Sequence, residues 1–413
     1  MDNTASMRQL VHRVVDETPV LDMHTHIYAP AFGSLLLWGV DELITYHYLV
    51  AEVFRVAPMP YERFWAMSKR EQADYIWKHL FVERSPVSEA CRGVLTVLHA
   101  LGLDTGPRDL AAARKYFAST TVEKFVDTVF TTANVKSVVM TNDPFDDQER
   151  PAWLNGHTCD QRFQAALRID PLLNGWEQAV PRLREWGYEV TGELRERDVE
   201  QVRRFLRDWV ARMRPRYMAV SLPPSFRFPE DSPRGRLIEN CVMPVAREAN
   251  IPFALMIGVR RNVNPGLQLA ADGVGTADIT VVDALCRAFP DNRFLVTMLS
   301  RENQHELCVA ARKHPNLLVF GCWWFLNNPT FIRDMTSQRL ELLGLSFVPQ
   351  HSDARVLDQL IYKWAHSRTI IADVLADKYA DLARTGWKIT EADIRRDVAD
   401  LLADNFERFA KRA

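Results

Sequence analysis

The sequence predicts an α/β protein folded as a (β/α)8 TIM barrel. Short, almost continuous apolar runs alternate with stretches of helical character, and eight such runs occur between Pro19 and Asp353. Strands that are apolar along their whole length are typical of a parallel sheet buried on both faces, and eight strand–helix units indicate a closed barrel. A doubly wound sheet is disfavoured, because His24-Thr25-His26 stands where that fold would carry a Gly-rich phosphate turn.

The first strand and the region after it set the domain organisation. Residues 6–17 predict a short amphipathic helix that leads into the first strand, residues 19–26. Residues 28–134 have helical character without a second strand pattern, and no polar linker rich in Pro or Gly sets them apart. We therefore expect a single barrel domain over residues 1–413, with a helical insertion at 28–134.

The remaining seven strands are predicted from residue 135 onwards. Each is a β-branched or otherwise apolar run that ends in polar residues and precedes a helical stretch. They are Lys136–Asn142, Phe163–Asp170, Arg216–Leu222, Pro252–Gly258, Arg293–Ser300, Asn316–Trp324 and Leu345–Asp353. Active sites of such barrels form at the carboxyl ends of the strands, so the polar residues there are the candidates for chemistry.

Composition excludes several classes of function. The 413 residues are 47% hydrophobic, and 51 basic against 53 acidic residues give a net charge of −2, which favours neither nucleic acid nor an anionic membrane surface. No apolar run reaches the length of a membrane span, and the N-terminus lacks a signal-peptide pattern, so we expect a soluble, cytoplasmic protein. Six scattered cysteines predict buried reduced thiols rather than disulfides; they are Cys91, Cys159, Cys241, Cys286, Cys308 and Cys322.

His24 and His26 form the strongest candidate for a metal site. Side chains at i and i+2 of a strand point to the same face, so both imidazoles project together near the end of the first strand. Asp353 ends the eighth strand, which neighbours the first once a barrel closes. Two neutral imidazoles and one carboxylate suit a divalent metal such as zinc and leave one coordination position open, as in barrels of the metal-dependent hydrolase type.

Less specific interpretations of these residues stay open. The two histidines could be unrelated loop residues, and Asp353 could be the N-cap of a helix over residues 354–363. His351 could be a fourth metal ligand, could hydrogen-bond to one of the ligands, or could have a purely structural role.

Four arginines at proposed strand ends indicate an anionic substrate, because a guanidinium group binds a carboxylate through two parallel hydrogen bonds. They are Arg168, Arg261, Arg301 and Arg355. The alternative is that each pairs with a nearby Asp or Glu. Two aromatic segments are also ambiguous: His47-Tyr48 is the polar part of an apolar helix, and Trp323-Trp324-Phe325 is either a pocket wall or core.

Six stretches of the chain together resemble one known family. They are Asp22–His26, Tyr46–Glu52, Thr141–Asp147, Leu167–Pro171, Gly321–Phe325 and His351–Arg355. His-x-His after strand one, His-Tyr in the following helix, Trp-Trp-Phe after strand seven and Asp-x-Arg after strand eight occur in that order. On these residues the chain resembles, nearly end to end, the uronate (glucuronate) isomerases of the amidohydrolase superfamily, in a divergent branch typified by bacilli.

The resemblance implies a reaction, a cofactor and an assembly. The reaction is the reversible isomerisation of D-glucuronate to D-fructuronate, and of D-galacturonate to D-tagaturonate, by proton transfer between C2 and C1. One divalent metal, expected to be zinc, would be bound by His24, His26 and Asp353. A homo-oligomer is expected, with a small-molecule hexuronate as the partner of the site.

The resemblance also implies roles for single residues. Tyr48 and Arg355 would assist proton transfer. The group that removes the proton from C2 stays open between Tyr48 and a metal-bound water, and the position of Asp353 suits it to take the hydroxyl proton that opens the cyclic sugar. Arg168 would bind the substrate carboxylate, while His47 and the Trp323-Trp324 wall would contact the substrate. Arg261 and Arg301 remain substrate-binding candidates because they lie at strand ends.

The chain departs from the mainstream branch of that family at two strand ends. That branch has Leu-His-Ile-Gly where this chain has Leu255-Met256-Ile257-Gly258, and an Asp-His pair where this chain has Val220-Ser221-Leu222-Pro223. The metal shell and the preferred epimer therefore stay open. The rival functions are a mononuclear metal-dependent hydrolase or decarboxylase of a carboxylated substrate, and a non-catalytic sugar-acid binder. A binuclear hydrolase would add a bridging Lys and middle-strand His ligands, which these strand ends lack.

Overall fold

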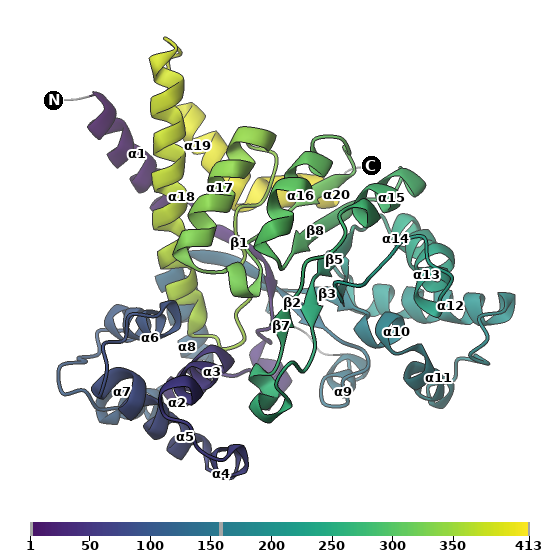
Figure 1. Ribbon diagram of the computed structural model, residues 1–413, viewed down its shortest axis with the longest axis horizontal. Helices are drawn as coiled ribbons and strands as arrows, with labels where there is room; N and C mark the ends of the chain where they lie inside the picture. The colour runs from purple at the N-terminus through teal and green to yellow at the C-terminus, as the bar shows by residue number, and fades with distance from the viewer. Residues whose placement is uncertain (1–2, 157–159, 412–413) are drawn as a thin grey trace.

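Parallel strands curl around a common axis with helices on their outer side, which confirms the predicted α/β barrel class (Figure 1). The computed structural model describes residues 3–156 and 160–411. Within those residues the main sheet has seven strands in the order β1-β2-β3-β4-β5-β8-β9, and all neighbours are parallel. The strands are β1 (Val20–Thr25), β2 (Val135–Asn142), β3 (Phe163–Arg168), β4 (Met218–Leu222), β5 (Phe253–Ile257), β8 (Phe294–Met298) and β9 (Leu317–Val319).

The eighth predicted strand, Leu345–Asp353, is not a regular strand, which corrects that expectation. One ladder bridge, at Val348, joins it to the chain just beyond β9, and Pro349 has no N–H group to continue the ladder. Backbone hydrogen bonds of 3.2 and 2.7 Å then join residues 353–354 to His24 and His26. The segment therefore still lies between β9 and β1 and closes the barrel.

Strand β9 is shorter than the predicted Asn316–Trp324, because the chain turns at Gly321. The φ of Gly321 is +65°, and a Cβ atom there would lie 1.7 Å from Nδ1 of His351. Only glycine fits this backbone conformation and this close approach. The turn carries the following residues, Cys322 onwards, over the mouth of the barrel.

Helices cover the barrel and make up most of the rest of the chain. They include the N-terminal helix, which begins at Asn3 rather than at the predicted residue 6 and packs along the long helix α18 (Figure 1). The α-helices are α1 (Asn3–Glu17), α2 (Val40–Ile44), α3 (His47–Val56), α4 (Tyr61–Trp65), α5 (Lys69–Trp77), α6 (Glu89–Ala100), α7 (Ala111–Ala118), α8 (Val122–Ala133), α9 (Arg150–Leu154), α10 (Asp170–Asn174), α11 (Trp176–Glu185), α12 (Glu196–Met213), α13 (Pro233–Leu237), α14 (Met243–Glu248), α15 (Thr280–Ala288), α16 (Gln304–Ala311), α17 (Pro329–Leu343), α18 (Gln359–Arg384), α19 (Glu391–Ala399) and α20 (Asn405–Lys411).

Helices α2–α8 lie within residues 28–134, the region predicted as a helical insertion. They pack against the barrel through contacts of α6 and α8 with α18. On the other side of the mouth, the short hairpin β6 (Val259–Arg260) and β7 (Gly273–Val274) carries the 3-10 helix η4 (Pro265–Ala270), which contacts α3. Trp65 donates a hydrogen bond to the carbonyl oxygen of Gly266 (2.9 Å), so the loop after β5 reaches across to the insertion.

The barrel interior is a packed core rather than a channel. Leu21, Met23 and Met256 belong to one buried cluster, which Phe406 and Phe409 of α20 join from the C-terminal part of the chain. Met256, where the mainstream branch of the resembled family carries a histidine, packs among these apolar side chains. The strand interiors are therefore filled below the polar residues at the carboxyl ends.

Two sequence expectations concern compartment and redox state. Over residues 3–156 and 160–411, no helix is long and apolar enough to cross a membrane. Five cysteines are buried free thiols, as predicted, while Cys159 lies outside the described residues.

Candidate metal centre

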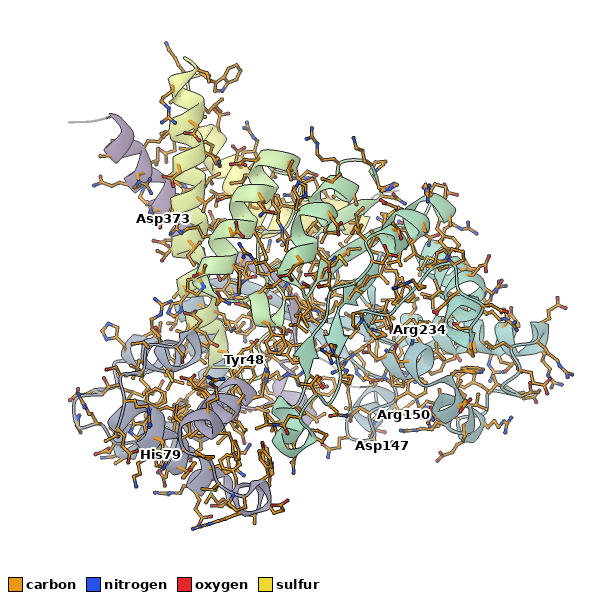
Figure 2. The ribbon with its side chains drawn as sticks, in the orientation of Figure 1. Tyr48, His79, Asp147, Arg150, Arg234 and Asp373 are labelled. Carbon is orange, nitrogen blue, oxygen red and sulfur yellow. The ribbon has the colours of Figure 1, made fainter. Side chains whose placement is uncertain are left out.

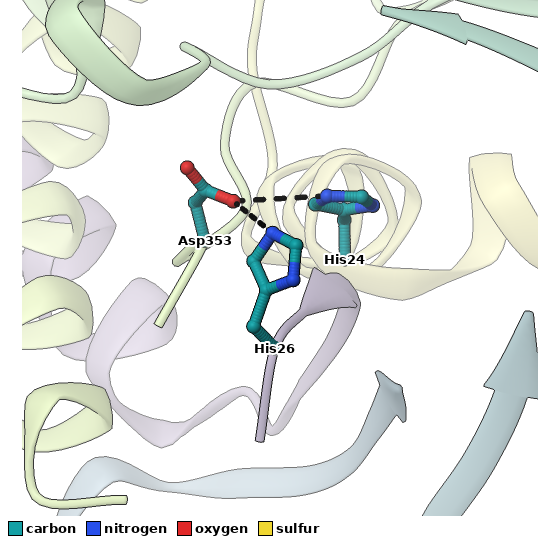
Figure 3. Close-up of side chains that lie close together, drawn as sticks. All are labelled: His24, His26 and Asp353. Carbon is teal, nitrogen blue, oxygen red and sulfur yellow. Dashed lines mark ion pairs between the residues drawn. The ribbon is translucent and has the colours of Figure 1, made fainter. Parts of the chain in front are cut away.

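His24, His26 and Asp353 converge at the carboxyl end of the barrel (Figure 3). Asp353 Oδ1 lies 3.7 Å from His24 Nε2 and 3.4 Å from His26 Nε2. The two imidazole rings are nearly perpendicular, with centroids 5.5 Å apart. The structure therefore brings together the three side chains that the sequence placed on the first and last strand positions.

The Tyr217 hydroxyl fixes the tautomer of His24. This hydroxyl donates to the carbonyl oxygen of Met23 (2.6 Å) and lies 3.1 Å from His24 Nδ1. Because its only proton is used on Met23, the hydroxyl must accept from His24 Nδ1–H. His24 is then the tautomer whose Nε2 lone pair faces Asp353 and is available to a metal.

The Thr141 hydroxyl fixes the tautomer of His26 in the same way. Its hydroxyl donates to the carbonyl oxygen of Thr25 (3.0 Å) and lies 2.8 Å from His26 Nδ1. Nδ1 of His26 therefore carries the proton, and Nε2 is free. Burial lowers the pKa of His24 to about 3 and that of His26 well below its usual value, so both rings are neutral, as metal ligands must be.

The residues present fit a divalent metal ion. His24 Nε2 and Asp353 Oδ1 are buried polar atoms without a hydrogen-bond partner among the described residues, and such atoms are costly unless something binds them. Two imidazole nitrogens and one carboxylate oxygen are the ligand types that zinc prefers, and three protein ligands leave a position for a water or a substrate oxygen. In the part of the chain that the structure describes, this is the one cluster of its kind.

Asp353 is held in place by its neighbours and is not a helix N-cap. Helix α18 begins at Gln359, so the N-cap alternative for Asp353 is wrong. Both oxygens of the buried Asp22 accept from the backbone N–H of Ser352 (3.1 and 3.3 Å), and Oδ2 also accepts from Trp364 Nε1 (2.8 Å). Asp22 thus ties the segment before Asp353 to strand β1.

His351 lies beside the centre but outside the cluster of three. Its ring centroid is 5.2 Å from that of His24, and neither ring nitrogen has a hydrogen-bond partner among the described residues. Burial lowers the pKa of His351 to about 3. His351 is therefore a neutral ring packed behind His24.

The four arginines differ sharply in position. Arg168 is three-quarters buried and pairs through two hydrogen bonds of 2.9 Å with Asp170, and its charge lowers the pKa of both His24 and His26. Arg355 is exposed, and its guanidinium has no hydrogen-bond or ion-pair partner among the described residues. Burial is the largest cause of the lowered pKa of His26, and the charge of Arg355 is the second. The charges of both arginines therefore act on the histidines of the centre.

The other two arginines lie farther out. Arg261 is about half exposed and pairs with Asp272 on the hairpin after β5, although its charge still reaches His26. Arg301 is 62% exposed and pairs with Asp334 at 3.5 Å. The acidic partner that the sequence left as the alternative is therefore present for Arg168, Arg261 and Arg301, and for Arg301 the pair lies on the surface.

His47, Trp324 and Phe325 form one wall between the insertion and the barrel. Trp324 Nε1 donates to His47 Nε2 (3.0 Å), which leaves the Nδ1–H of the buried, neutral His47 as a donor. Trp324 stacks on Phe325 at 4.9 Å, whereas Trp323 is buried in the barrel core. Tyr48, at the start of α3, lies where the insertion meets the barrel (Figure 2).

Sequence reasoning missed Tyr217 and Thr141 as supports of the two histidines. Thr141 lies in a stretch that carried the family resemblance, and Tyr217 lies in the predicted strand Arg216–Leu222. The available signal was a hydroxyl-bearing side chain within an apolar strand, since such a group needs a partner when it is buried.

Comparison with solved structures decides the family. The crystal structure of a uronate isomerase from Bacillus halodurans shares 60% sequence identity with this chain at a TM-score of 0.98, and the match covers 100% of this chain and 98% of that chain. The chain belongs to the uronate isomerase family.

More distant members of the uronate isomerase family share the fold. A uronate isomerase from Thermotoga maritima matches at a TM-score of 0.80 and 15% identity, over 98% of this chain and 97% of that chain. A glucuronate isomerase from Caulobacter crescentus matches at a TM-score of 0.80 and 16% identity, over 99% and 94%. No protein-family model and no curated protein matches the chain.

Proposed function

We propose that this chain is an aldose–ketose isomerase that interconverts D-glucuronate with D-fructuronate, and D-galacturonate with D-tagaturonate. The observation that carries the proposal is the full-length likeness, at 60% identity, to the uronate isomerase from Bacillus halodurans. The convergence of His24, His26 and Asp353 supports it, because an enolisation needs an electrophile at the substrate oxygens. Arg168 and Arg355 beside this cluster suit a carboxylate-bearing substrate.

The cofactor in this proposal is one zinc ion held by His24, His26 and Asp353. Bound there, zinc would polarise the carbonyl and the adjacent hydroxyl of the substrate and acidify the proton on C2. A homo-oligomer in the cytoplasm also belongs to the proposal, on the family resemblance.

The side chains around the centre divide the remaining work. Asp353 is placed to take the hydroxyl proton that opens the cyclic sugar. Arg168 binds the carboxylate of the substrate, since its guanidinium is already oriented by Asp170. His47 donates through Nδ1–H to a substrate oxygen, because Trp324 holds its other nitrogen. Arg355, without an acidic partner, stabilises the negative charge of the enediolate.

Tyr48 is the candidate that moves the proton between C2 and C1. Burial raises the pKa of its phenol well above the usual value, and Arg355 opposes that effect. Tyr48 therefore needs positive charge nearby in order to act as a base. A hydrolase of the binuclear type is disfavoured, because the middle strand β5 carries Met256 in the core.

The test is to incubate zinc-loaded protein with D-glucuronate and D-galacturonate in D2O and to follow the sugars by NMR. The proposal predicts the ketose product from at least one of the two acids. A non-catalytic binder would shift the sugar signals without product, a hydrolase would leave both hexuronates unchanged, and a decarboxylase would consume a hexuronate without forming the ketose acid. Silence with both acids contradicts the proposed activity.

A further inference from the structure

Lys363 on α18 is a buried cation that the proposed reaction has not yet used. The residue is only 4% exposed, it lines a cavity, and over residues 3–156 and 160–411 its ammonium group has neither a hydrogen bond nor an ion pair to another side chain. An ammonium group without an acidic partner in the interior is costly, and an apolar side chain of similar length would avoid that cost. The position therefore calls for a functional explanation.

The ammonium group of Lys363 lies close to the aromatic rings of Tyr48 and Tyr362. Nζ lies 5.5 Å from the centroid of the Tyr48 ring and 5.2 Å from that of Tyr362. A cation over an aromatic ring is attracted by the electrons of the ring. The attraction is stronger for a phenolate, because its negative charge is shared between the oxygen and the ring.

The nearby carboxylates do not neutralise Lys363. The charge of Glu89 acts on Lys363, but Glu89 pairs with Arg92 and with His366, each at 2.6 Å. Asp353 is committed to the metal cluster. Burial lowers the pKa of Lys363 to about 8, against the opposing effect of these two carboxylates, so the amine is still mainly protonated at neutral pH.

A cavity of 220 Å³ borders this pair. Its lining includes Tyr48, Trp324, Phe325, Tyr362 and Lys363. The end of the Lys363 side chain borders this cavity. A smaller side chain at position 363 would leave additional empty space there, and a small molecule could occupy that space.

We propose that Lys363 is a positioning residue of the isomerisation: its ammonium group, held against the Tyr48 ring, stabilises the Tyr48 phenolate that accepts the proton from C2. This inference rests on the proposed function. The C2–H bonding pair forms the C1–C2 double bond of the enediolate, and the carbonyl pair moves onto the C1 oxygen. The phenol then returns the proton to C1, where the electron pair of the C1–C2 double bond forms the new C–H bond. The hydroxyl proton on the C2 oxygen passes to the C1 oxygen, and the electron pair that it leaves forms the C2 carbonyl. Tyr48 therefore ends the cycle in the ionisation state in which it began.

The charges around Tyr48 set the size of the effect. Tyr46, Asp353 and Tyr362 raise the pKa of Tyr48, and Arg355 lowers it. Nζ lies 5.5 Å from the centroid of the Tyr48 ring. At an effective dielectric constant of about 20, a unit charge at that distance from the phenolate charge would change the ionisation constant of the phenol by at most about 100-fold. Loss of the ammonium should therefore lower kcat by about 10–100-fold and leave KM within about threefold, because the proposal gives Lys363 a contact with Tyr48 and none with the substrate.

The test compares Lys363→Met with wild type and with Lys378→Met. Lys378 is on the same helix and pairs with Glu341 on the surface, so its variant should keep the wild-type kcat. Lys363→Met should lose kcat, retain zinc and melt no lower than wild type. Full kcat in Lys363→Met would overturn the inference while leaving the isomerase function intact, whereas an inactive wild type would refute the function itself.

Chemical rescue separates charge from shape. Lys363→Ala leaves space beside the cavity, and n-propylammonium replaces the missing part of the side chain with its charge. The inference predicts that n-propylammonium restores kcat of Lys363→Ala at least tenfold, while neutral n-propanol does not. Equal effects of the two additives, or none, would assign Lys363 a packing role and contradict the proposal.

Discussion

The hydroxyl of Tyr217 lies 3.1 Å from Nδ1 of His24 and joins the beginning of strand β4 to strand β1 across the interior of the barrel. Its proton is used on the carbonyl oxygen of Met23, so this contact determines which nitrogen of His24 is free. The candidate metal centre thus depends on a residue 193 positions away in the sequence.

Tyr217→Phe should therefore weaken zinc binding by about 10–100-fold, the usual effect of losing a partner that orients a metal ligand. The phenyl ring keeps the packing against Phe406, so the fold should persist. Competition with a chelator measures the affinity. Tyr188→Phe, which removes a hydroxyl that pairs with Asp208 elsewhere, is the control, and equal affinities in the two variants would refute the role of Tyr217.

Thr141 should behave in the same way toward His26. Thr141→Val removes the acceptor of the His26 Nδ1–H bond while keeping the branched shape, and it should lower zinc affinity about 10-fold. Thr141→Ser retains the hydroxyl and should bind zinc nearly as well as wild type. The same chelator titration applies. A serine variant as weak as the valine variant would show that side-chain packing, not the hydrogen bond, is what matters.

Arg168 and Arg301 provide a matched pair for the substrate carboxylate. Arg168→Met should keep zinc and raise KM for the hexuronate by about 10-fold or more, because a charged hydrogen bond to the substrate is lost. Arg301→Met should leave KM unchanged, since Arg301 pairs with Asp334 on the surface. Steady-state kinetics check both. Similar changes in the two variants would contradict the placement of the carboxylate at Arg168.

Asp358 should make stability fall as the pH rises. Its Oδ2 accepts from the N–H of Gly39 (3.0 Å), and burial raises its pKa from 3.8 to about 7. Between these values the folded chain keeps a proton that the unfolded chain has lost, so the group costs stability progressively across that window. Asp358→Asn keeps the acceptor for Gly39 and should melt higher than wild type near pH 8 but not near pH 4. The same difference in melting temperature between Asp358→Asn and wild type at both pH values would contradict the raised pKa of Asp358.

Several features were predictable because their signals are local. His24 and His26 lie two residues apart on one strand, and the apolar strands β2, β4, β5 and β8 end within about two residues of their predicted ends. The prediction that Asp353 joins the two histidines required only that the last strand position of the barrel lie next to the first. These inferences depend on strand periodicity and on barrel closure, and both hold here.

The remaining features depend on contacts that sequence patterns do not encode. The proton on His24 is fixed by Tyr217, a partner from another strand. Arg301 was placed at a strand end, but β8 ends at Met298, and Arg301 begins a short 3-10 helix that carries it to the surface. The last strand position is irregular because Pro349 cannot continue the ladder.

The most direct test of the metal centre is the zinc content of wild type and of Asp353→Asn, measured by elemental analysis together with turnover of the hexuronate. The account predicts about one zinc per wild-type chain, as expected for a single three-residue site. Asp353→Asn should lose both the metal and the ketose product. A variant that keeps bound zinc and activity, or an active wild type free of metal, would contradict the central claim.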